Sequence, residues 1–560
     1  MNTKIAELKK LFTKFDIDFY IVPSQDEFLG EYTTDHSNRL QYITGFAGSN
    51  GLALFSKEGQ DYFFTDGRYL LQAKTQLEGD FKIIDMAVNS LSDILSLLLS
   101  ENKKICLDPK LHNIMQIDNL IKKFSIDQVA FVEKNLVDFI WKDRPKRNYS
   151  NVEIHPLEYA GESTANKIRK ITSRMEKDCV DFFVVTDPHS VCWLLNIRGR
   201  DLEYTPLVLS SAILSLNGSV RLFCNNHCDK DVIKYFKDNN ITLFKEGNFS
   251  NELKKIAESK VLLSNRSSYW VLSNLQDVEI GTDYCELPKA CKNETEINGT
   301  IQAHIRDGRA VCKLLNWIES TLESKGQITE LDISEKVLEF RSEEKHFVTP
   351  SFATIAGFKS NGAIIHYRPT TATNKTISDG MLLIDSGGQY LDGTTDITRT
   401  ICIGEPTEEQ KRDFTLVLKG LIRVANAKFN YDTTGADLDV FARKALADEG
   451  KDYAHGTGHG VGSFLSVHEG PQSISKHSSV TLRPGMILSI EPGFYKEGEY
   501  GIRIENLAFV KESDSQDMLE FQTLTKAPIQ EKLVDFDMLT DSETKWLEDY
   551  NKNCKTLNSL

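Results

Sequence analysis

The sequence predicts a mixed α/β fold, α+β in its last part, with two related N-terminal α/β domains followed by a larger C-terminal domain. Three observations lead to this prediction. The chain has 560 residues, whereas a single hydrophobic core stops growing near about 250–300 residues. Strand and helix patterns alternate twice through the first half. From about residue 289 the character changes to long amphipathic helices between carboxylate-rich strands, so we expect domains at 1–152, 153–288 and 289–560.

The first two predicted domains follow one order of elements. After an amphipathic basic helix, MNTKIAELKKLFTKF, the chain continues with the apolar strands DFYIVPS (18–24) and NGLALFS (50–56). The segment DFFVVTDPHSVCWLLNIRG (181–199) repeats the sequence of strand, acidic turn, helix and aromatic-rich turn, and AILSLNGSVRLF parallels LALFSKEGQDYFF. This faint internal repeat indicates two related domains, joined by the polar stretch 143–151.

Four helices are expected in the third domain, at 298–322, 329–342, 407–429 and 435–450. Apolar residues recur in them at helical spacing. Thr329 and Asp332 have the spacing of a capping box at the start of the second helix. Gly450 is expected to end the fourth.

Composition limits the classes of partner. The chain has 66 basic and 81 acidic residues, a net charge of −15, which argues against binding nucleic acid through its phosphates. It contains no apolar run near the ~20 residues that a membrane helix needs, and we find no signal peptide. Ten scattered cysteines do not form a disulfide framework. We therefore expect a cytoplasmic protein with reduced thiols.

The stretch HGTGHGVGSFLSVHEGP (455–471) places His455, His459 and His468 among five glycines. Two histidines four residues apart are typical of a helical zinc motif. Glycine at every second position from 456 to 462 excludes a helix, because each glycine costs a helix interior ~1 kcal/mol relative to alanine. These histidines must lie on a strand or a loop, and their partners must come from other segments.

Four carboxylates occur on apolar strands of this region. Asp385 ends one strand of MLLIDSGGQYLDGTTDITRT and Asp396 begins the next, so the two can face each other in a hairpin. Glu491 ends the strand GMILSIE, and Glu505 shares a face of the expected strand EYGIRIENLAFV (499–510) with Arg503. Singly, each has a plain alternative: the aspartates can cap a turn with Asp392, and Arg503 with Glu505 can be a buried ion pair.

Taken together, the four carboxylates favour a metal site. A buried carboxylate is costly unless it is paired or bound to a metal, and several of them repel one another unless a cation lies between. A hard, oxygen-rich pair of divalent cations with one imidazole ligand fits this set. Two metals ~3.5–4 Å apart can polarise a carbonyl and activate water for hydrolysis.

The strings DSGGQYLDGTTDITRT, HGTGHGVGSFLSVHEGP, EPGFY and YGIRIEN resemble the metal-site motifs of the pita-bread metallopeptidases. The similarity is greatest to the long, three-domain Xaa-Pro aminopeptidases (aminopeptidase P), through YIVPSQDEF, TDGRYLLQA, NLVDFIWKDRP, WLLNIRGRDLEYTP, GAIIHYRP and the C-terminal LTKAPIQEKLVDFDMLTDSETKWLEDY. The resemblance implies two creatinase-like N-terminal domains and a pita-bread catalytic domain with a curved, mostly antiparallel sheet and a C-terminal extension.

Position by position, the resemblance implies roles for nine residues. The dinuclear ligands are Asp385, Asp396, His459, Glu491 and Glu505, with Asp396 and Glu505 bridging. His366, His455 and His468 line the substrate pocket and stabilise the tetrahedral intermediate, although a histidine after two isoleucines, as at His366, can equally be a core residue. Arg503 holds a ligand carboxylate. Two departures from relatives are Ile490 before a ligand and Ala353 in SFATI. The implied cofactor is two divalent ions, expected to be Mn²⁺, with Zn²⁺ or Co²⁺ as alternatives.

The expected activity is release of the first residue from peptides with proline second, by a metalloaminopeptidase that forms a homodimer. A hydroxide bridging the metals attacks the carbonyl, and Glu491 shuttles a proton to the leaving nitrogen. Neutral His455 or His468 donates to the oxyanion. Prolidase and methionine aminopeptidase are alternatives with shorter chains. A non-catalytic binding module or a metal-independent amidinohydrolase is disfavoured because all five ligand positions are kept.

Overall fold

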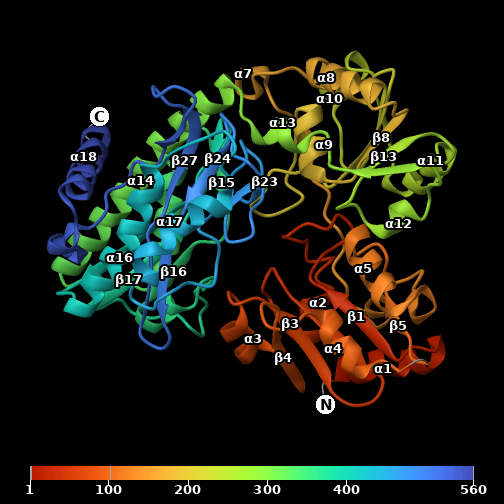
Figure 1. Ribbon diagram of the computed structural model, residues 1–560, viewed down its shortest axis with the longest axis horizontal. Helices are drawn as coiled ribbons and strands as arrows, with labels where there is room; N and C mark the ends of the chain where they lie inside the picture. The colour runs from red at the N-terminus through yellow and green to blue at the C-terminus, as the bar shows by residue number, and fades with distance from the viewer. Residues whose placement is uncertain (1–2, 101, 559–560) are drawn as a thin grey trace. The chain divides into compact units, whose positions relative to one another are not determined.

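The computed structural model describes residues 3–100 and 102–558, and the chain divides into two compact units. Unit 1 comprises Met1–Ile154, Ser163–Leu202 and Leu207–Cys285, and unit 2 comprises His155–Glu162, Glu203–Pro206 and Glu286–Leu560. Figure 1 colours unit 1 mainly from red to yellow-green and the long C-terminal part of unit 2 from green to blue. The three domain ranges stay predictions, since unit 1 contains both N-terminal sheets.

Unit 1 contains two six-stranded sheets with the same topology, which confirms the internal repeat. Their strand orders are β4-β3-β2-β1-β5-β6 and β12-β11-β10-β8-β13-β14. In each, the first strand pairs antiparallel with the sheet's next strand along the chain and parallel with a later strand on its other side. The bounds are β1 Phe19–Pro23, β2 Leu52–Ser56, β3 Asp61–Thr65, β4 Phe81–Asp85, β5 Ile105–Leu107, β6 Val129–Phe131, β8 Phe182–Val185, β10 Ser211–Ser215, β11 Val220–Phe223, β12 Ile241–Phe244, β13 Val261–Ser264 and β14 Val278–Gly281.

Helices cover both faces of these sheets, so their central strands are apolar throughout. All five residues of β1 are buried. The predicted N-terminal helix is α1 (Thr3–Phe15), which buries Ile5, Leu8 and Phe12 at helical spacing. The remaining helices of unit 1 are α2 Arg39–Thr44, α3 Leu70–Gln76, α4 Leu91–Leu98, α5 Ile114–Phe124, α6 Leu136–Ile140, α8 Thr164–Lys177, α9 Pro188–Leu195, α10 Lys230–Asp238, α11 Phe249–Lys255 and α12 Tyr269–Leu272.

The four helices predicted in unit 2 are present, and their ends follow capping rules. Thr329 and Asp332 form the expected capping box. The last of the four ends at Ala447, three residues before Gly450, which has φ +68°. Lys451 N bonds Leu446 O and Gly450 N bonds Ala447 O, so Gly450 closes a Schellman motif as expected. The helices are α7 Leu157–Ala160, α13 Glu286–Ala290, α14 Glu294–Glu323, α15 Glu330–Ser342, α16 Glu408–Ala425, α17 Gly435–Ala447 and α18 Asp541–Asn558.

The strands of unit 2 pair antiparallel, as predicted for the C-terminal domain. A six-stranded sheet has the order β21-β28-β27-β24-β22-β23, and a three-stranded sheet has the order β16-β17-β20. The main core packs α16 and α17 against these strands, with Ile490 fully buried in it. The bounds are β15 Phe347–Pro350, β16 Ile355–Phe358, β17 Gly380–Ser386, β18 Gly388–Tyr390, β19 Gly393–Thr394, β20 Ile397–Ile403, β21 Lys428–Phe429, β22 Gly458–Gly460, β23 Glu469–Ile474, β24 Ile487–Ile490, β25 Gly493–Lys496, β26 Tyr500–Arg503, β27 Asn506–Glu512 and β28 Leu519–Thr523.

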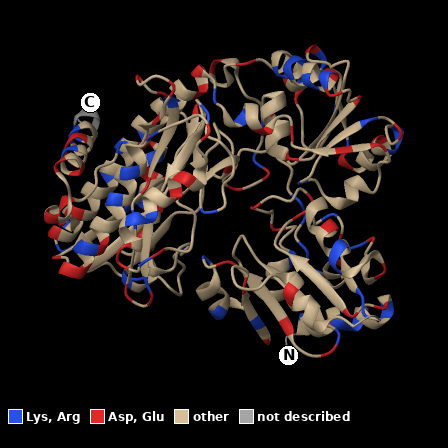
Figure 2. Ribbon diagram, viewed as in Figure 1, with Lys and Arg blue, Asp and Glu red and all other residues tan. Residues whose placement is uncertain are grey.

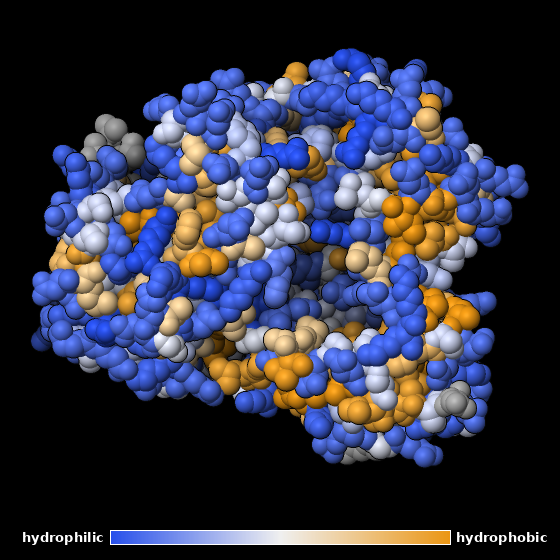
Figure 3. Space-filling view, in the orientation of Figure 1, coloured by the Kyte–Doolittle hydropathy of each residue, from blue (hydrophilic) through white to orange (hydrophobic). Residues whose placement is uncertain are grey.

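Charged residues of both signs are interspersed along the helices of each unit (Figure 2). The face drawn in Figure 3 is mainly hydrophilic and carries separate hydrophobic patches. Among the described residues, no helix combines the length and apolar character needed to cross a membrane.

Candidate metal centre

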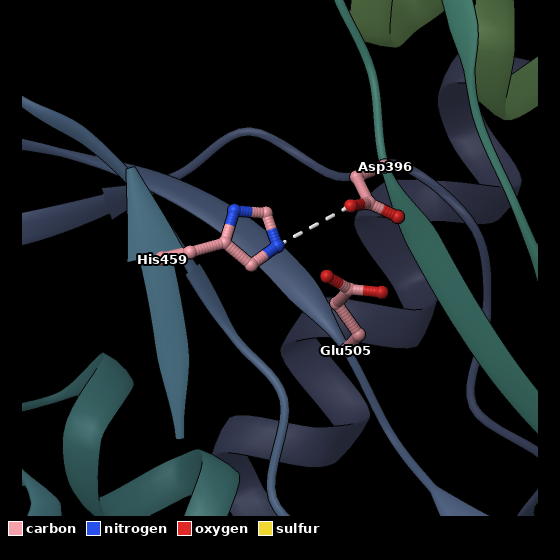
Figure 4. Close-up of side chains that lie close together, drawn as sticks. All are labelled: Asp396, His459 and Glu505. Atoms are coloured by element: carbon pink, nitrogen blue, oxygen red, sulfur yellow. Dashed lines mark ion pairs between the residues drawn. The ribbon is translucent and has the colours of Figure 1, made fainter. Parts of the chain in front are cut away.

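Five predicted ligand residues come from five separate segments of unit 2. Ligand atoms of Asp396, His459 and Glu505 all lie within 4.8 Å of one another, and Figure 4 shows the three side chains directed into one space. Glu491 joins them, with its Oε1 3.6 Å from Nε2 of His459. Asp385 lies close enough to Asp396 and Glu491 for their charges to affect its pKa. The elements are β17 for Asp385, the residue before β20 for Asp396, β22 for His459, the residue after β24 for Glu491, and the β26–β27 link for Glu505.

The β17–β20 hairpin holds the first two carboxylates at its end. The strands pair antiparallel, with Asp385 opposite Thr398. Thr398 Oγ1 donates to Oε2 of Glu505 at 2.9 Å, and Glu505 N donates to Thr398 O at 3.1 Å. The prediction of one strand over 499–510 is therefore wrong. The strand is interrupted between β26 and β27, and Glu505, in the interruption, bonds Thr398 of β20 instead.

The carboxylates are buried and short of partners. Asp385, Asp396 and Glu505 each have one buried oxygen with no hydrogen-bond partner among the described residues. Burial raises the pKa of Asp385 to about 7, with Arg503 opposing and Asp396 adding to the rise. Burial, then the charges of Asp396 and Glu491, raise the pKa of Glu505 well above its usual range. This cluster of mutually repelling acids needs a cation.

The backbone around His459 sets its tautomer. Nδ1 lies 2.9 Å from the carbonyl oxygen of Gly460, so Nδ1 carries the proton in the neutral ring and the lone pair of Nε2 faces the carboxylates. Nε2 lies 3.5 Å from Oδ2 of Asp396. Although burial opposes the charged imidazole, the Asp396 hydrogen bond and the Glu491 charge raise the pKa of His459 to about 9.

Two of the alternating glycines permit close backbone approach, as expected. A Cβ on Gly458 would lie 1.9 Å from Ser489 O, and one on Gly460 would lie 2.2 Å from Glu469 O. Only glycine therefore fits at positions 458 and 460 of β22, which lies between β23 and β24 in the sheet. The stretch is a strand and loop, which confirms that the helical zinc motif is absent.

Arg503 links the cluster to its surroundings. Its side chain is 2% exposed, and Nη2 donates to Oδ2 of Asp385 at 2.6 Å. Nη1 donates to the phenol oxygen of Tyr495 at 2.6 Å, and Nε lies 3.9 Å from Oε2 of Glu491. Arg503 thus contacts two candidate ligands. The alternative prediction paired Arg503 with Glu505, but the Glu505 carboxylate accepts from Thr398 instead.

The three histidines predicted for the substrate pocket have different surroundings. Nε2 of His455 lies 2.8 Å from the Tyr495 phenol and Nδ1 lies 2.7 Å from Gly456 O. The His468 ring meets the His459 ring edge-on at 4.3 Å between centroids. His366 lies in the turn after the 3₁₀ helix Lys359–Ala363, next to the Ile365 carbonyl, which is 3.5 Å from Nη1 of Arg503.

Sequence reasoning missed the residues that support the histidine loop. Arg443 on α17 donates to the carbonyl oxygen of His455 at 2.7 Å and to Asp439 at 2.7 Å. Thr457 Oγ1 donates to Asp439 at 2.6 Å, and Thr457 O accepts from Glu491 N at 2.7 Å. The helix was predicted, but nothing in its pattern indicated where its polar face would bond.

These residues fit a divalent metal pair. The donor set contains four carboxylates and one imidazole, which hard and borderline cations prefer. Three buried carboxylate oxygens lack hydrogen-bond partners among the described residues, and Nε2 of His459 faces Asp396 at 3.5 Å, so all of them are placed to act as ligand atoms.

Four family models match the chain in order. The Creatinase/Prolidase N-terminal domain matches residues 4–137 and, in a second form, 143–296. Metallopeptidase family M24 matches 299–512, and the C-terminal region of peptidase M24 matches 517–559.

Relatives match the chain along almost its whole length. The probable Xaa-Pro aminopeptidase P of Laccaria bicolor is 38% identical and covers 98% of this chain and 89% of its own. The probable Xaa-Pro aminopeptidase P of Neurospora crassa is 37% identical, and the match covers 99% of this chain and 85% of the relative. The structure of X-prolyl aminopeptidase from Caenorhabditis elegans superposes with a TM-score of 0.96 at 32% identity, covering 100% of this chain and 96% of its own. That protein is described as a cytosolic enzyme with a di-nuclear active site. The Xaa-Pro dipeptidase of Bacillus anthracis shares the fold, with a TM-score of 0.54 at 23% identity. The match covers 66% of this chain and 99% of the dipeptidase.

Proposed function

The chain belongs to metallopeptidase family M24, with the Xaa-Pro aminopeptidases P as full-length relatives, and from this membership we propose that it is a metal-dependent aminopeptidase. Its substrates are peptides with proline in the second position, and its products are the free first residue and the shortened peptide. The observation that carries the proposal is a group of buried carboxylates beside Nε2 of His459, three of which have an oxygen with no hydrogen-bond partner among the described residues.

Asp385, Asp396, His459, Glu491 and Glu505 are the proposed ligands of two divalent ions, with Asp396 and Glu505 shared between the two. When bound, such a pair polarises the scissile carbonyl and lowers the pKa of water. The proposal is supported by the ligand atoms of Asp396, Glu505 and His459, which all lie within 4.8 Å of one another.

Glu491 is the proposed proton carrier. Its side chain is 18% exposed, against 11% for Asp385 and 6% for Asp396, so it is the most open of these three carboxylates toward solvent and substrate. The nitrogen of an Xaa-Pro bond belongs to a tertiary amide and must receive a proton as it leaves. Glu491 takes a proton from the attacking water and delivers it to that nitrogen.

His468 is the proposed donor to the developing oxyanion. Both ring nitrogens of His455 have protein partners, because Gly456 O accepts from Nδ1 and the Tyr495 phenol lies against Nε2. In this arrangement the phenol donates to Nε2, so His455 has no N–H left for substrate. His455 then acts with Arg503 to fix Tyr495, while His468, beside the His459 ring, supplies the hydrogen bond. His366 stays a proposed substrate contact.

A comparison of three peptides tests the activity. The metal-loaded protein should release the first residue from Xaa-Pro-Pro and leave free Xaa-Pro dipeptides and Met-Ala peptides largely intact. Preferential cleavage of the dipeptide would favour a prolidase, and preferential cleavage of Met-Ala a methionine aminopeptidase. Either result would contradict the proposal.

Three finer features are also proposed. Manganese is the expected metal because oxygen ligands dominate the site, and zinc or cobalt are the alternatives that metal analysis of purified protein would reveal. A cytoplasmic location is supported by the relative described as cytosolic and is tested by fractionation of cells. A homodimer is tested by sedimentation of the full chain.

A further inference from the structure

Arg399 is a buried arginine on β20, three residues after the candidate ligand Asp396. Its residue is 3% exposed. The five N–H groups of a guanidinium form a planar fork, and here they reach six neutral acceptors. Those acceptors are the carbonyl oxygens of Thr398, Glu505, Ala527 and Pro528, the amide oxygen of Asn506 and the phenol oxygen of Tyr550.

One side of this fork holds the backbone of Glu505. Nη1 of Arg399 donates to the carbonyl oxygen of Glu505 at 2.6 Å and to that of Thr398 at 2.9 Å. Thr398 in turn bonds both the backbone N–H and the carboxylate of Glu505. The position of the Glu505 carboxylate therefore depends on a frame that Arg399 completes.

The other side of the fork holds the C-terminal segment. Nη2 donates to the Tyr550 phenol at 2.7 Å and to Ala527 O at 2.7 Å. Tyr550 lies on α18 and also donates to Ala527 O at 2.9 Å. Its neighbour Asn551 bonds the N–H and the carbonyl of Ile529, each at 2.9 Å. The helix thus fixes residues 525–529 against the guanidinium.

We infer that Arg399 and Tyr550 are positioning residues through which the C-terminal helix sets the affinity of the metal centre. Arg399 bonds both the Glu505 backbone, through Nη1, and α18, through Nη2. Outer partners that orient ligands typically change metal affinity about 10–100-fold when altered. The inference rests on the proposed function only in taking Glu505 as a metal ligand.

The test measures Mn²⁺ binding to the metal-free full-length protein by titration calorimetry. Tyr550→Phe keeps the ring, which stacks on Trp546 at 5.2 Å, and removes only the phenol oxygen. Arg399→Lys keeps the positive charge but removes the planar guanidinium that reaches both Glu505 and Tyr550. The control is Tyr20→Phe, which removes another buried phenol, one that accepts from Leu136 N at 3.1 Å in unit 1. Circular dichroism checks that each variant is folded.

Both variants should raise the Kd for Mn²⁺ by about tenfold or more, while the control stays within twofold of wild type. At saturating Mn²⁺ their turnover should approach that of wild type, because the residues act through the ligand. Values of Kd within twofold of wild type in folded Tyr550→Phe would overturn the inference, even if Arg399→Lys does not fold. A wild-type protein that binds Mn²⁺ but leaves Xaa-Pro peptides intact would instead overturn the proposed function alone.

Discussion

Arg503 and Tyr495 form a 2.6 Å hydrogen bond between Nη1 and the phenol oxygen. The same phenol lies 2.8 Å from Nε2 of His455, and the other end of the guanidinium holds Asp385. One buried arginine therefore joins a candidate metal ligand to a candidate pocket histidine through a tyrosine. The burial of Tyr495 raises its pKa to about 12 despite the nearby Arg503, so the phenol stays protonated and can donate.

Tyr495→Phe should lower kcat by about tenfold or more while metal content is kept, because His455 and Arg503 lose the group between them. Steady-state kinetics with metal analysis measure this. Tyr500→Phe is the matched control on the same β25–β26 hairpin, since its phenol bonds Asp413 on α16 at 2.8 Å. Equal effects of the two substitutions would contradict a specific role for Tyr495.

Glu491→Gln should lower turnover by about 10²–10⁴-fold, the usual contribution of general acid–base catalysis. The amide keeps the volume of the side chain but cannot carry the proton. Glu499→Gln, at an exposed acid of the same region, should leave turnover unchanged. A Glu491→Gln protein that keeps its metal and loses no more than about tenfold in turnover would refute the proton-carrier role.

Gly458→Ala should destabilise the protein by more than the ~1–3 kcal/mol usual for overpacking, because the new methyl meets backbone at Ser489 O, 1.9 Å away. Metal binding should fall with it, since His459 is the next residue. Gly456→Ala is the control, because its nearest neighbours lie 3.4 Å away. Thermal melting and Mn²⁺ titration compare the two, and similar melting temperatures would show that the sheet tolerates a side chain at 458.

His112 should make unit 1 sensitive to acid. Burial lowers the pKa of His112 to about 4, and its Nε2 has no hydrogen-bond partner among the described residues. Between this value and about 6.5, the ordinary value, the unfolded chain binds the proton and the folded chain does not. Protonation of His112 therefore does not affect the free energy of unfolding above pH ~6.5. As pH falls from ~6.5 toward 4, it lowers that free energy by at most ~3 kcal/mol.

His112→Phe should flatten the fall in melting temperature between pH 6.5 and 4, whereas His477→Gln, at an exposed histidine, should leave it unchanged. A pH profile of His112→Phe that matches wild type would show that this histidine does not contribute to acid sensitivity.

Local patterns were sufficient to predict the repeat, the capping box at Thr329 and the glycine at 450. The four candidate carboxylates could be found because burying a carboxylate on an apolar strand costs free energy unless it is paired or bound to a metal. The role of His459 was implied by the family resemblance. The supporting residues could not be found, since Arg399 and Tyr550 are 151 positions apart and each alone looks ordinary. The break before Asn506 was also missed, because the alternation of side chains continues across it while the hydrogen-bonded ladder does not.

Stepwise metal loading tests the central claim most directly. Mn²⁺ is added to metal-free protein while release of the first residue from an Xaa-Pro-Yaa peptide is measured alongside bound metal. We predict no release without metal, full activity when two equivalents are bound, and little cleavage of the matching Xaa-Ala-Yaa peptide. Activity that is independent of metal, or a fully loaded protein that cleaves neither peptide, would contradict the account.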